Sequence, residues 1–218
     1  MTLKNIVVLI SGRGTNLDAL LKAAADERWA ERPGAQVAAV ISNRVDAPGL
    51  DVARAAGVPS HVVSHGGYGS REEFDEALAR TIDRYSPALV VLAGFMRVLT
   101  AGFVRRYAGR LVNIHPSLLP LFPGLSTHRQ ALAAGVRVHG ATVHFVSTEV
   151  DGGAIIAQAA VPVQPDDDEA RLAARVLAEE HRLLPRAVKL VLEGRVRFEN
   201  ERVLLEGIGP NELSLFAA

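Results

Sequence analysis

The sequence predicts an α/β protein with a doubly wound, mostly parallel sheet that carries helices on both faces. Two observations support this prediction. Continuous apolar runs alternate along the first half of the chain with segments whose apolar residues recur at helical spacing, which is typical of a parallel sheet covered on both faces. In addition, 49% of the 218 residues are hydrophobic, which is enough for the core of one well-packed domain.

The first strand and helix of this alternation have the clearest pattern. Ile6–Ile10 is a continuous run rich in β-branched residues. The apolar residues that follow recur at helical spacing: Leu17, Leu20, Leu21, Ala24 and Ala25. Further strand and helix pairs are predicted at 37–41 and 50–56, at 61–63 and 74–85, and at 89–92 and 103–107, before a strand at 111–114.

The pattern changes after this last strand. Two strands are predicted at 140–146 and 154–163, joined through Asp151–Gly153 as a hairpin-like addition to the sheet. A long helix is predicted from about Asp168 to Glu193, preceded by acidic residues whose charge suits a helix N-terminus. Pro185 lies within that helix, so a kink or a break is expected there.

The charge and composition exclude several classes of partner. Lys plus Arg equal Asp plus Glu at 24 each, so no bulk electrostatic argument favours nucleic acid or an anionic membrane. The absence of Cys excludes disulfides and thiolate zinc sites, and it fits a reducing cytosol. With no signal-peptide pattern and no apolar run of ~18 residues, we expect an unprocessed, cytoplasmic protein that binds small molecules.

An amide and an imidazole stand two residues apart at the end of the strand that begins at 111. Strand residues at this spacing point the same way, so Asn113 and His115 are predicted to project together from the carboxyl end of a strand, where such sheets bind ligands. The amide can donate to a developing oxyanion while the His gives or takes a proton. The pair therefore suits a reaction with a tetrahedral intermediate, although a lone His is often only structural.

Asp151 has two interpretations. It lies in a tight polar turn, where an Asp often accepts hydrogen bonds from local N–H groups. It could instead face His115 and favour the cationic form of the ring. Spacing along the chain leaves both open. His139 and His144 match no zinc signature and are interpreted as structural, so no metal is expected.

The segment Ser11–Asn16 joins the first strand to the first helix. Glycines here allow backbone N–H groups to approach an anion, and the helix N-terminus and Arg13 add positive charge, so a phosphate site is predicted. A dinucleotide site is the alternative, but its third Gly would fall at Leu17, and Ser42–Asn43 offers no acidic residue to hold a ribose. A turn that binds nothing is the other alternative.

Together these motifs resemble the formyltransferases that use 10-formyltetrahydrofolate, and among them those that act on glycinamide ribonucleotide in purine biosynthesis. The resemblance runs from Ile6 to about His181. Its segments are Ile10–Leu17, Val91–Leu99, Asn113–Pro120 and Gly140–Val146 continued through Asp151 and Gly153. The segment from 115 to 120 alone indicates only the wider group of folate formyl carriers, and the phosphate loop makes the resemblance more specific.

The resemblance implies a Rossmann-like formyltransferase fold in a single domain over 1–218. Within this domain, residues from about 1 to 110 would form the half that binds the ribotide phosphate. Residues from about 111 to 200 would form the half that binds the folate and carries the catalytic residues. It implies transfer of a formyl group from 10-formyltetrahydrofolate, as co-substrate, to the amine of glycinamide ribonucleotide. The implied partners are these small molecules, with no nucleic acid and no membrane, and a homodimer is a possible assembly.

The resemblance also implies roles for individual residues. Asn113 would be the oxyanion donor, His115 the proton shuttle, and Asp151 the partner that favours cationic His and orders water. The ribotide phosphate would be held by Gly12, Arg13, Gly14, Thr15 and Asn16, and the glycinamide end would meet Glu180. The folate would contact Arg71, Met96, Arg97, Val98, Leu99 and Asn113. Leu177, Leu121 and Ser126 depart from residues found in some relatives.

Three rival functions remain to be weighed. Hydrolysis of the same formyl donor would leave the phosphate loop without a purpose. Formylation of methionyl-tRNA would call for an additional nucleic-acid-binding domain and a basic surface, which neither the length nor the charge of this chain allows for. A nucleotide sensor would share the fold. A sensor has no need of an oxyanion donor beside a titratable His, which favours an enzyme.

Overall fold

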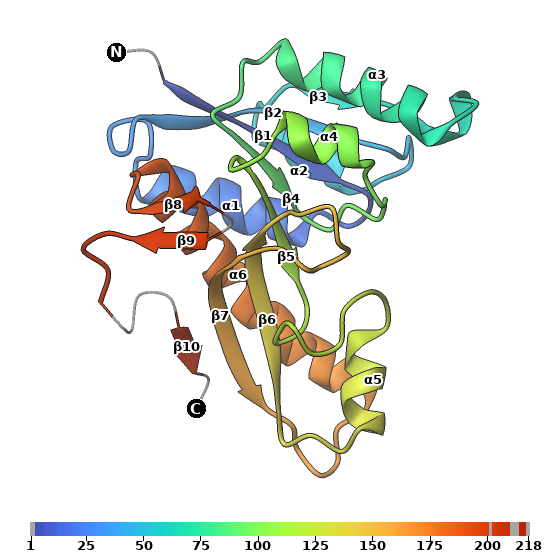
Figure 1. Cartoon of the computed structure of the whole chain (residues 1–218), viewed down its shortest axis with the longest axis vertical. Coiled ribbons are helices and arrows are strands. Elements are labelled where there is room, and N and C mark those ends of the chain that lie inside the picture. The colour runs from blue at the N-terminus through green and yellow to red at the C-terminus, as the bar shows by residue number, and fades with distance from the viewer. Residues whose placement is uncertain (1–2, 201, 210–213, 217–218) are drawn as a thin grey trace. The chain divides into compact units, whose positions relative to one another are not determined.

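The computed structural model describes residues 3–200, 202–209 and 214–216. The chain divides into two compact units, Met1–Val112 and Asn113–Ala218. Figure 1 shows the first in blue to green and the second in yellow to red. The fold is the doubly wound, mostly parallel α/β arrangement that the sequence predicts. Within the described residues, no helix combines the length and apolar character that crossing a membrane would require.

Four parallel strands form the sheet of the first unit. Their order is β3-β2-β1-β4, and their bounds are Lys4–Ile10 (β1), Ala35–Ser42 (β2), Ser60–Val62 (β3) and Leu89–Leu92 (β4). Ile6–Ile10 of β1 is fully buried, as the continuous apolar run predicts. The connecting helices are α1 (Thr15–Asp26), α2 (Gly49–Ala55), the 3-10 turn η1 (His65–Gly67), α3 (Arg71–Asp83) and α4 (Ala101–Arg106).

The second unit contains the predicted hairpin. Strand β6 (Val138–Phe145) pairs antiparallel with β7 (Ile155–Pro162), and β10 (Ser214–Phe216) pairs parallel with β7 on its other side. The predicted strand that precedes them is β5 (Leu111–His115). Helix α5 (Thr127–Ala133), the antiparallel pair β8 (Val196–Glu199) and β9 (Arg202–Leu205), and β10 were not predicted from the sequence.

A single long helix, α6 (Glu169–Leu192), follows the hairpin. The side chain of Asp168 accepts a hydrogen bond from Arg171 N at 2.8 Å and caps its first turn. The helix continues through Pro185, so of the expected kink or break, the break is wrong and the kink stays a prediction. A proline costs a helix about 3 kcal/mol, whereas burial of one Leu side chain stabilises by about 1.5–3 kcal/mol. Leu183, Leu184 and Val188 are all buried, and their packing outweighs the interruption.

Candidate active site

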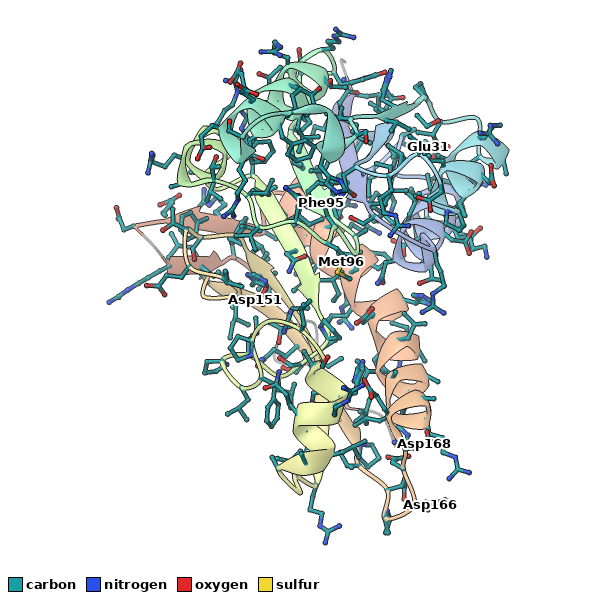
Figure 2. The ribbon with its side chains drawn as sticks, turned by 90° about the vertical axis from the view of Figure 1, so that its right-hand side faces the viewer. Glu31, Phe95, Met96, Asp151, Asp166 and Asp168 are labelled. Carbon is teal, nitrogen blue, oxygen red and sulfur yellow. The ribbon has the colours of Figure 1, made fainter. Side chains whose placement is uncertain are left out.

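Strand β5 ends in the two residues that the sequence singled out. Asn113 is half-buried and His115 is buried, with 5% of its surface exposed. Both belong to the second unit, and so does Asp151, which lies beside His115. Figure 2 labels Asp151. The structure therefore brings the carboxylate of Asp151 to the imidazole of His115, on the strand where the sequence already placed the amide and the imidazole together.

The amide of Asn113 is oriented by a second histidine. Asn113 Nδ2 lies 3.2 Å from Nε2 of His144, and Nδ1 of His144 lies 3.0 Å from the carbonyl oxygen of Phe145. A carbonyl can only accept, so Nδ1 carries the hydrogen and Nε2 accepts from the amide. Burial lowers the pKa of His144, which favours this neutral form. Because an amide group carries two hydrogens, this bond leaves one that can reach an oxyanion.

His115 is held between a carboxylate and a backbone carbonyl. Its Nδ1 lies 3.4 Å from Oδ2 of Asp151, within ion-pair distance, and its Nε2 donates to the carbonyl oxygen of Phe122 at 3.1 Å. Both ring nitrogens therefore face oxygen acceptors, an arrangement that suits the cationic ring. Oδ2 of Asp151 also accepts from Gly124 N at 2.8 Å. Asp151 therefore meets His115 and the backbone N–H of Gly124, which lies 27 residues away in the chain, and this placement agrees with the second interpretation of Asp151.

The turn that carries Asp151 depends on its two glycines. Asp151 adopts a left-handed conformation with φ of 53°. A Cβ on Gly153 would lie 1.7 Å from the carbonyl oxygen of Phe145, and one on Gly152 would lie 2.8 Å from Cβ of Glu149. Neither position has room for a side chain. The Asp-Gly-Gly sequence thus lets the backbone turn tightly against the end of β6 and present the carboxylate to His115.

Two other histidines pack close to this site. The rings of His128 and His139 meet edge to face, with centroids 5.3 Å apart, and His139 also contacts Phe122. Burial, and to a smaller extent the neighbouring His128, lower the pKa of His139 to about 4, so His139 is neutral at pH 7. In the described part of the chain, no group of three or more metal-ligating side chains could hold a metal ion.

The predicted phosphate loop lies in the first unit, between β1 and α1. Gly14 has φ of 76° and approaches Gly49 so closely that a Cβ on Gly14 would lie 2.6 Å from Cα of Gly49. The carbonyl oxygen of Gly12 accepts from Gly49 N at 3.0 Å. Gly14 caps α1 without a side-chain hydrogen bond, so its position leaves the first turn approachable by an anion. Arg13 is exposed beside it. The other two predicted residues, Thr15 and Asn16, begin α1.

One predicted folate-contacting residue, Asn113, belongs to the second unit, and the other five lie within the first. They are Arg71, Met96, Arg97, Val98 and Leu99. Arg71, the first residue of α3, donates from Nη2 to the carbonyl oxygen of Val98 at 2.9 Å. The guanidinium of Arg97 lies over the ring of Phe74, 5.5 Å from its centroid. Met96 and Val98 are 69% and 56% exposed, and Phe95, which precedes Met96, is buried. Figure 2 labels Phe95 and Met96.

Glu180 lies on α6 in the second unit, which also holds the three catalytic candidates. It is buried, with 7% of its surface exposed. Leu177, one turn earlier, is half-buried.

Sequence reasoning missed the part that His144 plays. It was interpreted as structural because its spacing matches no metal site, yet it holds the Asn113 amide from 31 residues away in the chain. The sequence did offer one signal, which is that His144 lies on the predicted strand after the one that carries Asn113 and His115. The polar Thr142 lies two residues before it, on the same face of that strand. That signal does not say which residue the ring would contact.

The chain is similar to known formyltransferases over most of its length. The sequence profile of the formyl transferase family matches residues 4–188. Phosphoribosylglycinamide formyltransferase of Escherichia coli is 48% identical over 203 residues, which cover 93% of this chain and 94% of that protein. The trifunctional purine biosynthetic protein adenosine-3 of Drosophila melanogaster is 52% identical over 88% of this chain, and the match spans 14% of that longer protein.

Solved structures give the same result. The phosphoribosylglycinamide formyltransferase of Coxiella burnetii superposes with a TM-score of 0.88 at 43% identity, covering 98% of this chain and 99% of that one. A formyltetrahydrofolate deformylase from Pseudomonas syringae superposes with a TM-score of 0.83 at 29% identity, and the match covers 94% of this chain and 66% of the deformylase.

Proposed function

This chain belongs to the formyl transferase family, and we propose that it transfers a formyl group from 10-formyltetrahydrofolate to the amine of glycinamide ribonucleotide in purine biosynthesis. The observation that carries the proposal is the set formed by Asn113, His115 and Asp151. It places an oxyanion donor and a proton-transfer group side by side at the end of one strand. The identity to the Escherichia coli enzyme over nearly the full length of both chains supports the choice of acceptor.

The reaction follows from the chemistry of these groups. The lone pair of the glycinamide amine forms a bond to the formyl carbon, and the carbonyl electron pair moves to oxygen. Asn113 and cationic His115 stabilise the resulting oxyanion. The carbon–nitrogen bond to the folate then breaks, with its electron pair going to the folate nitrogen. The attacking nitrogen loses a proton and the folate nitrogen gains one, and His115 carries this proton, directly or through water ordered by Asp151.

The geometry of His115 supports this role. Its Nε2–H group is directed at the carbonyl oxygen of Phe122, the kind of acceptor that a formyl oxygen would offer. Its other nitrogen faces Asp151, whose negative charge stabilises the ring while it is cationic. Stabilisation of the oxyanion needs no metal ion in this mechanism, because the Asn113 amide and the His115 imidazolium supply the positive electrostatic potential.

Substrate placement is the second part of the proposal. The loop formed by Gly12, Arg13, Gly14, Thr15 and Asn16 holds the ribotide phosphate, and Glu180 meets the glycinamide end. The folate contacts Arg71, Met96, Arg97, Val98, Leu99 and Asn113. An uncapped helix start beside an exposed arginine supports the first assignment. Exposed apolar side chains beside ordered backbone support the second.

The proposal also covers the setting of the enzyme. It includes a cytoplasmic location and one formyltransferase domain over residues 1–218, with a homodimer as a possible assembly. The lack of cysteine fits a reducing compartment. Sedimentation of the purified protein measures the assembly directly.

A hydrolytic reaction is the alternative, favoured by the superposition on a formyltetrahydrofolate deformylase. Both reactions release tetrahydrofolate, so the acceptor distinguishes them. We expect the rate of tetrahydrofolate release from 10-formyltetrahydrofolate to depend on added glycinamide ribonucleotide. An equal rate without the ribotide would replace the proposed transfer with hydrolysis.

Gly12→Val tests the phosphate assignment. A Cβ on Gly12 would meet no atom within 4 Å, so the fold tolerates a side chain there and the added bulk fills the space beside the loop. The KM for the ribotide should rise ~10-fold or more while the KM for the folate stays within about two-fold. Gly67→Val, at another glycine with open space around it, is the matched control and should alter neither. If Gly12→Val instead raised the KM for the folate and left the KM for the ribotide unchanged, the two subsites would be exchanged.

Asp151→Asn separates charge from shape at the carboxylate. Asparagine keeps the size of the side chain and an oxygen that can accept from Gly124 N, but it removes the charge that faces His115. We expect kcat to fall ~10-fold or more, since the ring must then give and take its proton without the negative charge that faces its Nδ1. Asp46→Asn, at an exposed surface pair, is the control. Wild-type kcat in Asp151→Asn would limit this carboxylate to a role in the turn.

A further inference from the structure

Ser11 is a buried serine that connects three segments of the first unit. It follows β1, immediately before the glycine loop, and only 6% of its surface is exposed. Its backbone N donates to the carbonyl oxygen of Gly94 at 3.1 Å. Its hydroxyl oxygen accepts from Met96 N at 2.7 Å and donates to Oδ1 of Asn43 at 2.6 Å. One short side chain thus links the ends of β1 and β2 to the segment after β4.

The direction of these bonds is fixed by their partners. A backbone N–H can only donate, so Ser11 must accept from Met96, and its single hydroxyl hydrogen is then directed at Asn43. Asn43 is itself buried, with 4% of its surface exposed. Its backbone carbonyl oxygen lies 3.2 Å from Nδ1 of His65. Asn43 therefore orients the hydroxyl so that its lone pair faces Met96.

The segment that Ser11 reaches has no regular secondary structure from Phe95 to Thr100. Side chains from outside the segment hold its backbone at alternate positions. Ser11 accepts from Met96 N, Arg71 donates to Val98 O, and Asp75 accepts from Thr100 N at 2.6 Å. Because this segment forms no helix or strand, it has no regular series of backbone hydrogen bonds, and these few bonds hold its shape. Ser11 fixes the end that carries the most exposed side chain, Met96.

We propose that Ser11 is a positioning residue for folate binding: although it adjoins the phosphate loop, its hydroxyl fixes the Met96 backbone against which the folate lies. The inference rests on the proposed function, which places the folate at Met96–Leu99. Removing the hydroxyl leaves Met96 N without its buried acceptor, and the segment relaxes away from the geometry that the folate needs. The backbone bond to Gly94 and the glycine loop itself stay in place.

Ser11→Ala is the test, with steady-state kinetics for both substrates. The KM for 10-formyltetrahydrofolate should rise ~3- to 10-fold, the scale of one hydrogen bond, while the ribotide KM and kcat at saturation stay within about two-fold. Ser11→Thr keeps the hydroxyl and should restore the folate KM to within about two-fold of wild type. A merely structural role would instead lower the fraction of active enzyme, and with it kcat, without this split between the KM values.

Ser42→Ala is the matched control. Ser42 is also a buried serine at the end of a strand, but among the described residues its hydroxyl bonds to the backbone of Arg44, as donor to the carbonyl and acceptor from the N–H. The Ser42→Ala variant also loses a serine hydroxyl, but one that does not contact the Met96 segment, so its KM for the folate should match wild type. If Ser11→Ala folds poorly, Asn43→Ala provides the second variant, because it deprives the Ser11 hydroxyl of its acceptor. Its folate KM should rise in the same direction.

Direct binding of 10-formyltetrahydrofolate in the absence of ribotide separates this inference from the proposed function. Wild-type enzyme that fails to bind the folate would overturn the proposed function. Wild-type binding with an unchanged dissociation constant in Ser11→Ala would overturn the role of Ser11 alone. A ribotide KM that rises as much as the folate KM would also overturn it, since Ser11 would then act on the phosphate loop.

Discussion

His115→Ala is expected to lower kcat by ~10²-fold or more, with the KM values of both substrates within about two-fold of wild type. The ring is buried at the end of β5 between Asp151 and the Phe122 carbonyl, so it has a fixed position from which to donate and accept a proton. Alanine removes the proton carrier and the positive charge that meets the oxyanion. Stopped-flow or steady-state measurement of tetrahydrofolate release gives kcat directly.

A second histidine variant controls for the loss of an imidazole. His61 lies on β3 and contacts the Tyr85 hydroxyl in the first unit, and His61→Ala should keep kcat within about two-fold of wild type. Activity of His115→Ala within a few-fold of wild type would remove His115 from the mechanism, whatever happens to its neighbours.

Asn113→Ala is expected to lower kcat by ~10²- to 10³-fold, the usual effect of removing one oxyanion donor. The amide is held by His144, so its remaining hydrogen has a defined direction. Because the oxyanion exists only in the transition state and the intermediate, the ground-state affinities for the ribotide and for a folate that lacks the formyl group should change little.

Asn5→Ala provides the comparison for this variant. Asn5 also lies on a strand and donates through its amide, to the carbonyl oxygen of Tyr85 at 2.7 Å. Its loss should leave kcat close to wild type. If Asn113→Ala raised KM while kcat stayed unchanged, Asn113 would be a substrate-binding residue and the oxyanion would need a different donor.

Strands β1 and β4 were predictable because each contains a continuous apolar run buried on both faces. Helix α5 was not, since its apolar residues are three consecutive positions at its end, Ala131–Ala133, and show no helical periodicity. The continuity of α6 through Pro185 depends on burial of the residues around it, which the local rule for proline does not include.

The site was predictable where its signal is local. Asn113 and His115 stand two residues apart on one strand, and the glycine loop lies within a few residues of the first helix. The contacts of Asp151 with His115, of His144 with Asn113, and of Ser11 with Met96 join residues that are far apart in the chain. Tertiary packing sets these contacts, and no local pattern specifies them.

The fate of a labelled formyl group tests the central claim most directly. The enzyme would be given glycinamide ribonucleotide and 10-formyltetrahydrofolate with a ¹³C formyl carbon, and the products would be weighed by mass spectrometry. The account predicts that the label appears in formylated ribotide, in step with the tetrahydrofolate released. Labelled formate with unmodified ribotide would contradict it, since the enzyme would then pass the formyl group to water.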